Sequence, residues 1–393
     1  MAAGVFEVRE FRAVWGAEVL SIAGDQLARV ALAVLVFART GSARQSAAVY
    51  ALTFLPAMAG GVLLGGLADR FRRRELMVTA DVLRAVLTAV MALPGLPLPL
   101  LCGLLVVVVL AGTPFTAAQG ALLPEVLPGG LYERGLAVRQ ITGQTAQLAG
   151  FATGGLVVAA LGTGTALLLD AATFLASATL LRAGLRNRAR PSAERSEPGA
   201  GRVLPGLFRD PARRRPMLLA WLVGCYVVPE ALAAPYAGGN AAATGLLMAA
   251  DPGGSIAGVW LFVRYIPETT RRRLVGPLAV AAGLPLVLCA FGPGLAITAV
   301  LWALSGVCST SYLLQAQADF VRATPGEQRG RAIGIASAGL IAGQGTAILA
   351  GGLLADWTNP VAAVVAAGLA GAVLCAVVAR TTDAGDRARS ADR

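Results

Sequence analysis

A few charged side chains lie within long apolar segments of this sequence, and they are the residues best able to do chemistry. In the first segment Glu18, Asp25 and Arg29 fall on one helical stripe, and Asp25 precedes Arg29 by one turn, so the two can pair. Charges in apolar surroundings are costly and usually serve binding or proton transfer. Asp25 and Arg29 are therefore predicted either to bind a substrate or a proton, or to form an ion pair that holds this segment to a neighbour.

Two further carboxylates occur in apolar segments of the second half. Glu230 lies between Pro229 and Pro235, with Tyr226 one turn before it and no basic residue in its segment. Such a carboxylate can carry a proton or contact a substrate; the alternative is a hydrated position near an outer mouth. Asp251 is followed by Pro-Gly-Gly, a helix break whose backbone groups only a cavity or another part of the protein can satisfy. Both carboxylates are candidates for proton coupling or substrate binding.

Three glutamines form a polar stripe on another segment. Gln140, Gln144 and Gln147 are spaced i, i+4 and i+7, so they share one helix face, and Gln344 repeats Gln147 in the second half. Amides on one face can line a hydrated path for a polar substrate or form hydrogen bonds between helices. The sequence leaves both interpretations open.

The basic residues exclude several kinds of chemistry. All 33 are arginine, and the chain has no histidine. Histidine-based triads and zinc sites, a Walker A lysine and a pyridoxal Schiff base therefore cannot form, and the paired-carboxylate motif of a metal-dependent lipid enzyme does not occur. We expect a protein that is not an enzyme and uses no cofactor and no metal. The cysteines lie in apolar runs and are interpreted as packing residues: Cys102, Cys225, Cys289, Cys308 and Cys375.

The elements that carry these residues are predicted to be membrane-spanning helices. Of 393 residues, 56% are hydrophobic and 14% are charged, and the mean hydropathy is +0.69; a soluble domain has about 25% charged residues. A spanning helix needs about 20 mostly apolar residues, and twelve such segments can be marked. They cover residues 12–37, 46–68, 76–94, 98–118, 138–160, 163–182, 216–236, 241–263, 274–292, 294–314, 330–355 and 360–380.

Arginine placement predicts the orientation of these helices. With the N-terminus in the cytoplasm, only Arg39 and Arg44 fall in outer loops, Arg29 and Arg84 lie inside segments, and every other arginine is cytoplasmic, as the positive-inside rule requires. The net charge of +11 follows this topology, so we expect no nucleic-acid partner. Both ends of the chain are predicted to be cytoplasmic, in a bacterial inner membrane.

One polar stretch divides the chain. Residues 183–215 are rich in Arg, Pro, Ser and Glu and are predicted to form a cytoplasmic linker. The linker separates an N-terminal six-helix bundle, residues 1–182, from a C-terminal six-helix bundle, residues 216–380. A cytoplasmic tail, residues 381–393, is predicted to follow.

An internal repeat supports two related halves. Gly154-Gly155-Leu156 recurs as Gly351-Gly352-Leu353, and Pro128-Gly129 recurs as Pro325-Gly326, both at a spacing of 197 residues. Parallel repeats of this kind are a known transporter design, and small residues allow helices to approach closely. The predicted helix-packing glycines are Gly150, Gly154, Gly155, Gly351 and Gly352.

The loop after the second segment carries a family motif. The run from Gly65 to Arg74, Gly-Gly-Leu-Ala-Asp-Arg-Phe-Arg-Arg-Arg, resembles motif A of the major facilitator superfamily, with Arg72 where the family usually has Gly. The resemblance implies twelve transmembrane helices in two six-helix bundles. It also implies a gate in which Asp69 accepts hydrogen bonds at the start of the eleventh helix, near Gly330, where the helix dipole is positive. The alternative is an arginine cluster that only fixes orientation. The gating residues would be Gly65, Asp69, Arg70, Arg73 and Arg74.

Other features resemble the branch of that superfamily that exports drugs such as macrolides and siderophores. They are Gly24-Asp25-Gln26-Leu27, Asp81 with Arg84, and Asp170-Ala171-Ala172-Thr173-Phe174. Two proton-antiporter motifs depart from the pattern, because segment 98–118 has no Arg and Phe151 stands where the fifth helix usually has Pro. We interpret Asp170 as a helix-packing residue.

The resemblance implies secondary transport by alternating access. We expect a monomer, embedded in membrane lipids, that moves a small amphipathic molecule out of the cell in exchange for protons, with Asp25 or Glu230 as the proton carrier. The altered motifs also allow a sensor or scaffold that does not transport, and an uptake transporter is a further alternative.

Overall fold

The computed structural model describes residues 4–188 and 204–391, and all regular structure in these ranges is helical, with no strand. Residues 189–203 of the predicted linker therefore lie outside the described residues. The side chains of Val62, Asp69 and residues 204–206, 326–331 and 381–391 also lie outside the description.

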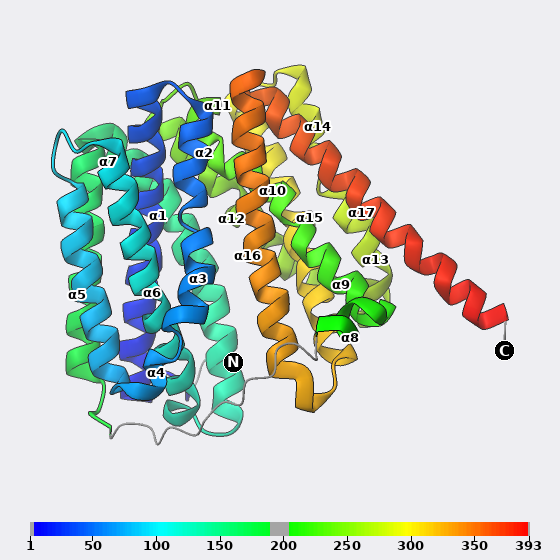
Figure 1. Ribbon diagram of the computed structural model, residues 1–393, viewed down its shortest axis with the longest axis horizontal. Coiled ribbons are helices and arrows are strands. Elements are labelled where there is room, and N and C mark those ends of the chain that lie inside the picture. The colour runs from blue at the N-terminus through cyan, green and yellow to red at the C-terminus, as the bar shows by residue number, and fades with distance from the viewer. Residues whose placement is uncertain (1–3, 189–203, 392–393) are drawn as a thin grey trace. The chain divides into compact units, whose positions relative to one another are not determined.

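The helices follow one another along the chain as Figure 1 labels them. In the first half they are α1 (Arg9–Thr40), α2 (Ala43–Ala51), α3 (Leu55–Leu64), α4 (Leu67–Arg70), α5 (Arg73–Met91), α6 (Leu98–Val126) and α7 (Gly130–Gly184). In the second half they are α8 (Leu204–Arg209), α9 (Pro211–Leu222), α10 (Gly224–Ala231), α11 (Ala233–Tyr236), α12 (Ala241–Tyr265), α13 (Glu268–Ala281), α14 (Leu284–Leu288), α15 (Leu295–Ala323), α16 (Gly326–Trp357) and α17 (Pro360–Ala391).

The chain forms two compact units. Unit 1 comprises Met1–Gly41, Leu52–Arg195 and Ala237–Ala249, and unit 2 comprises Ser42–Ala51, Ser196–Tyr236 and Ala250–Arg393. Residues 42–51 belong to unit 2 although the residues on either side of them belong to unit 1. Residues 237–249 belong to unit 1 although their neighbours in sequence belong to unit 2. The predicted bundle boundaries do not include this exchange, and they stay a prediction.

Eight helices among the described residues are long and apolar enough to cross a membrane. One of them, α7, covers two predicted segments in 55 residues. Gly162 divides it, because its φ of 82° and ψ of 169° are not helical and suit a residue without a Cβ atom. The all-helical membrane fold is thus confirmed, whereas the count of twelve spans stays a prediction.

Several predicted segments are interrupted in the structure, among them 46–68, 216–236 and 274–292. Residues 52–54 separate α2 from α3, within the predicted segment 46–68. The segment 216–236 consists of α9, α10 and α11, which contain Pro216, Pro229 and Pro235. Proline lacks a backbone N–H and breaks the helical hydrogen-bond ladder. The three prolines therefore account for the short helices α9, α10 and α11.

In unit 1, helix α1 packs closely against α7 through glycine. A Cβ atom on Gly150 would lie 2.9 Å from Gln26 Cβ, and one on Gly154 would lie 3.0 Å from Leu27 Cα. At one end of the unit an apolar cluster of α1, α5, α6 and α7 residues completes the packing, with Phe11, Met77 and Leu181 fully buried. This packing brings polar residues of α1, α5 and α7 within bonding distance.

Candidate functional site

The buried face of α5 contains a charged pair. Residues Met77, Ala80, Asp81, Arg84, Ala85, Thr88 and Met91 of this helix are buried. They recur every three or four positions, so they form one stripe that faces the unit's interior. Asp81 and Arg84 lie on that stripe, and α5 therefore carries its two charges into the core of unit 1. Helix α5 begins at Arg73 and has Glu75 in its first turn, where a carboxylate stabilises the helix through its dipole.

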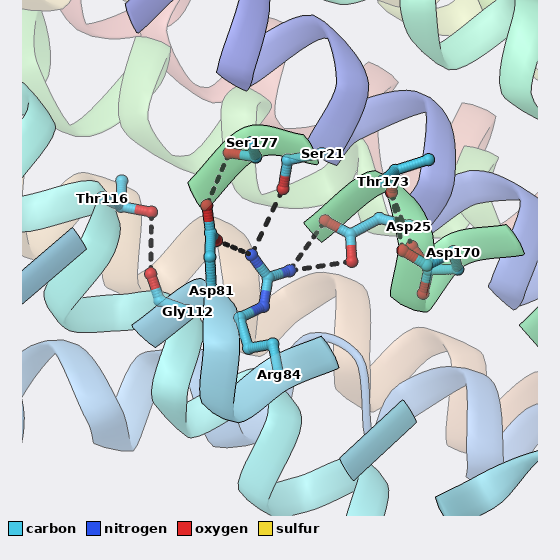
Figure 2. A network of polar contacts seen from close by, with 9 residues as sticks. All are labelled: Ser21, Asp25, Asp81, Arg84, Gly112, Thr116, Asp170, Thr173 and Ser177. Atoms are coloured by element: carbon cyan, nitrogen blue, oxygen red, sulfur yellow. Dashed lines mark hydrogen bonds and ion pairs between the residues drawn. The ribbon is translucent and has the colours of Figure 1, made fainter. Parts of the chain in front are cut away.

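Arg84 forms a two-pronged ion pair with Asp25 of α1. Its Nη2 atom donates to Asp25 Oδ1 at 2.8 Å and to Oδ2 at 2.9 Å, and its Nη1 atom donates to Ser21 Oγ at 3.2 Å. The guanidinium also lies over the Phe174 ring of α7, 3.9 Å from its centroid. Figure 2 shows Arg84 reaching from α5 between α1 and α7. A cation held by a carboxylate, a hydroxyl and a ring face is strongly positioned.

Two more carboxylates lie beside this pair. Asp81 is fully buried, and its Oδ2 accepts a hydrogen bond from Ser177 Oγ of α7 at 2.5 Å. Asp170 of α7 is also buried, and Thr173 Oγ1 donates to its Oδ1 at 3.4 Å. Gly24 makes room for this contact, because a Cβ atom there would collide with both Asp170 and Thr173. Asp170 packs against α1, as predicted, but it does so as a member of a charged cluster.

The cluster has more acids than bases. Arg84 is the one guanidinium drawn among Asp25, Asp81 and Asp170 in Figure 2. If all three carboxylates were ionised, buried negative charge would remain uncompensated, which low-dielectric surroundings disfavour. No group of three His, Cys, Asp or Glu side chains in the described part of the chain has the geometry of a metal site. Three carboxylates thus share one buried guanidinium.

The ion pair of Asp25 that the structure shows joins it to a neighbouring helix. Asp25 pairs with Arg84 of another helix, whereas the Arg29 guanidinium lies over the Phe54 ring, 5.1 Å from its centroid. Both carboxylate oxygens of Asp25 accept from the single Nη2 atom of Arg84, which approaches from the packed helix α5. Glu18, on the same stripe, pairs instead with Arg139 of α7 at 2.5 and 2.7 Å.

The motif A arginines form a second network at the start of α5. Arg73 donates to the Ala121 carbonyl of α6 at 3.0 Å and pairs with Glu125, and Arg74 donates to the Leu185 carbonyl at 3.1 Å. Gly65 follows the last residue of α3 and Arg70 is exposed. Helix α16 begins at Gly326, four residues before the predicted start near Gly330. The side chains of Asp69 and of residues 326–331 lie outside the description, so the gate contact remains an expectation.

Arg188 extends this network beyond the last helix of unit 1. It donates to Glu10 of α1 at 2.8 and 3.0 Å and lies 3.7 Å from Glu125 of α6. The hydrogen bond to Glu10 raises the pKa of Arg188, so this arginine keeps its charge. The ion pairs tie the beginning of the predicted linker to α1 and α6.

The other candidates lie elsewhere. Glu230 is buried in α10, and Asp251 is half-buried in α12 beside Gly306; both belong to unit 2. One turn after Asp251, the Ser255 hydroxyl bonds with that of Thr310 at 2.6 Å. The glutamine stripe on α7 is exposed at Gln140 and half-buried at the next two positions, Gln144 and Gln147.

The glycine predictions correspond to close helix contacts. A Cβ atom on Gly155 would lie 2.7 Å from Gly245 Cα within unit 1. In unit 2, a Cβ on Gly351 would collide with Val228 and one on Gly352 with Ala47. The repeated glycines thus sit where neighbouring helices approach most closely.

Sequence reasoning missed the cluster around Arg84 as a unit. Asp81, Arg84 and Asp170 were noted only as points of family resemblance, and Ser177 was not noted. Asp81, Arg84 and Asp170 share one signal in the sequence, because each is a charged side chain in an apolar helix, where charges are rare. Periodicity could not show that α1, α5 and α7 bring them together.

Membrane-length helices around a buried cluster of charges define a polytopic membrane protein of the transporter class. The chain belongs to the Major Facilitator Superfamily, which it matches over residues 14–266 and again over residues 227–393. The resemblance drawn from motif A is thereby confirmed, whereas membership of the drug-efflux branch stays a prediction. No curated protein compared with the chain gives a significant match.

Several solved transporters share the fold. The nucleoside transporter NupG, as its D323A mutant, has a TM-score of 0.74 and 15% identity over 95% of this chain and 99% of its own. A bacterial homologue of the human lysosomal transporter Spinster, inward-facing and occupied, has a TM-score of 0.69 and 14% identity over 96% of each chain. A POT family transporter in complex with 5-aminolevulinic acid has a TM-score of 0.69 and 11% identity over 94% and 95%. Family and fold identify a transporter rather than an enzyme, as predicted.

Proposed function

We propose that this chain is a secondary transporter that works by alternating access, exports a small amphipathic molecule across the inner membrane and is driven by protons. The observation that carries the coupling is the cluster in which one guanidinium, Arg84, faces three carboxylates. Asp25 is the carboxylate we assign as proton carrier, because its side chain is 35% exposed whereas Asp81 is fully buried. The partial exposure of Asp25 supports its assignment as the carboxylate that exchanges protons.

The substrate class follows from the apolar character of the spans and their few polar groups. The half-buried Gln144 and Gln147 can hydrogen-bond a polar part, while the apolar helix faces suit the rest of the molecule. A growth screen of cells with and without the gene, across antibiotics, siderophores and nucleosides, should identify a compound whose toxicity or uptake changes. Nucleosides are included because NupG, a nucleoside transporter, shares the fold.

The first prediction concerns coupling. With the compound from that screen, an imposed pH gradient should drive its movement in membrane vesicles, and Asp25→Asn should abolish that movement while the protein still purifies as a folded monomer. Glu7→Gln, which removes an exposed carboxylate before α1, is the matched control and should behave as wild type. Glu230→Gln tests the other predicted carrier.

Unchanged pH-driven transport in both Asp25→Asn and Glu230→Gln would reject the coupling. Wild-type vesicles that move no compound of the panel would favour a sensor or scaffold instead. Accumulation of the compound by intact cells would indicate uptake rather than export.

A further inference from the structure

Asp81 offers a hydrogen-bond acceptor that nothing fills. Ser177 donates to Oδ2, but Oδ1 is buried and accepts no hydrogen bond from the residues that the structure describes. Arg84 forms an ion pair with this oxygen, but its Nη1 atom lies 3.6 Å away, too far for a hydrogen bond. A buried carboxylate oxygen left without a donor is costly, so such atoms usually have a reason to be there.

Arg84 can reach that oxygen by turning its own side chain. Asp81 and Arg84 lie three residues apart on α5, so they share one helix face. Nη2 is occupied by both oxygens of Asp25, while Nη1 bonds to Ser21 at 3.2 Å, and the buried Nε forms no hydrogen bond with the described residues. Moving the guanidinium from Asp25 to Asp81 therefore needs no movement of α5.

Charge balance favours a closer contact of Arg84 with Asp81 when Asp25 is neutral. Arg84 is 93% buried, with a relative exposure of 7%, and a buried cation without a counter-ion is strongly disfavoured. Around it, α1 presents Asp25 and Ser21, and α7 presents Asp170, Phe174 and Ser177. Helix α6 presents Gly112, which has no charge.

We propose that Arg84 is shared between two carboxylates, and that Asp81 is the positioning residue that holds it when Asp25 is protonated. This inference rests on the proposed function, because Asp25 is there the proton carrier. A proton adds to an Asp25 carboxylate oxygen, the ion pair with Arg84 breaks, and an Arg84 N–H then donates to Asp81 Oδ1. Loss of the proton reverses each step. The link between α1 and α5 is thereby opened, while the Ser177–Asp81 hydrogen bond still joins α5 to α7.

The test measures proton binding directly and needs no substrate. Infrared spectra of the purified protein in detergent, recorded across a pH series, should show a carboxylic-acid C=O band that disappears in Asp25→Asn; its midpoint reports protonation of Asp25. Asp81→Asn removes a carboxylate that competes with Asp25 for Arg84. Protonation of Asp25 then becomes harder, and the midpoint should move to lower pH by about one unit, which is a tenfold change in proton concentration.

Ser177→Ala should shift the midpoint in the opposite direction. Asp81 loses its hydroxyl donor and competes more strongly for Arg84, so Asp25 takes up its proton at higher pH. Thr116→Val also removes one hydroxyl, but Thr116 donates to the Gly112 carbonyl of its own helix, so this substitution should leave the midpoint unchanged.

The outcomes separate the two proposals. A wild-type spectrum without an Asp25-dependent band would reject Asp25 as proton carrier. A normal band whose midpoint is the same in Asp81→Asn would overturn the sharing of Arg84 and leave the proposed function standing. Opposite shifts in Asp81→Asn and Ser177→Ala support the sharing, because a merely structural role of Asp81 would lower stability without moving the midpoint.

Discussion

At the scale of single residues, burial decides which ion pairs matter. An exposed i, i+4 ion pair on a helix surface contributes about 0.3–0.5 kcal/mol. The pair between Asp25 and Arg84 is formed by an arginine that is only 8% exposed at its side chain. Loss of one partner of such a pair leaves an uncompensated charge, and that penalty is much larger than the value of a surface contact.

We predict a large effect of Arg84→Gln that a second substitution relieves. Arg84→Gln leaves Asp25, Asp81 and Asp170 without their guanidinium and should lower the free energy of unfolding by about 3–5 kcal/mol. Adding Asp25→Asn removes one of the uncompensated carboxylates, so the double variant should recover a coupling energy of about 1–3 kcal/mol. Thermal unfolding of the four proteins in detergent measures this cycle. Strictly additive effects would show that the two residues do not interact.

At the scale of helices, glycine determines where α7 ends one segment and where it meets its neighbours. The backbone of Gly162 has non-helical φ and ψ angles, and this residue divides α7 between the two predicted apolar segments 138–160 and 163–182. Gly155 allows α7 to contact the first part of α12 at Gly245. Its counterpart Gly352, 197 residues later, allows α16 to contact α2 at Ala47. Both contacts use the segments exchanged between the units.

We predict that Gly155→Ala and Gly352→Ala destabilise the protein although alanine is the better helix former. Each added methyl group would collide with the neighbouring helix, and such overpacking costs about 1–3 kcal/mol. Gly103→Ala is the matched control, because nothing lies within 4 Å of a Cβ atom there; the substitution should be neutral or raise stability by up to about 1 kcal/mol. Thermal midpoints in detergent compare the three. A Gly155→Ala protein as stable as Gly103→Ala would contradict the packing argument.

At the scale of the whole molecule, the arginine distribution predicts how the chain crosses the membrane. A cysteine introduced at Ser196, in the predicted cytoplasmic linker, should react with a membrane-impermeant maleimide only after the cells are permeabilised. A cysteine at Gln45, which is exposed and belongs to a predicted outer loop, should react in intact cells. The native cysteines are buried or half-buried, so their background labelling should be low. Labelling of the Ser196 position in intact cells would reverse the topology.

Much of the fold was predictable because lipid imposes a strict requirement. Every backbone polar group in a bilayer must be satisfied within the protein, so long apolar runs such as 98–118 and 294–314 had to be helices, and α6 and α15 cover them. The exact ends were less predictable, since α15 continues to Ala323 beyond its apolar part. The polar helix α5 was predictable from its flanks, although it is not among the eight helices apolar enough to be recognised by hydropathy.

The candidate site was predictable only as a set of unusual residues. Asp25, Asp81 and Arg84 stand out because charges are rare in apolar helices, but their partners lie on different helices, far apart in sequence. Spacing along one helix suggested Arg29 for Asp25, since local geometry was all that the sequence could offer. The ion pair between Asp25 and Arg84 depends on how α1, α5 and α7 pack. That packing depends on glycine contacts between helices, which cannot be read from the sequence alone.

The sequence by itself determined the class of solvent, the helical content and the family, because apolar composition, arginine placement and motif A each reflect local or compositional constraints. Only the tertiary structure decided which charges meet: Arg84 with Asp25, Asp81 with Ser177, and Asp170 beside Gly24. The physical reason is that an ion pair depends on distances of a few ångströms between side chains of different helices, which packing sets and the order of residues does not record.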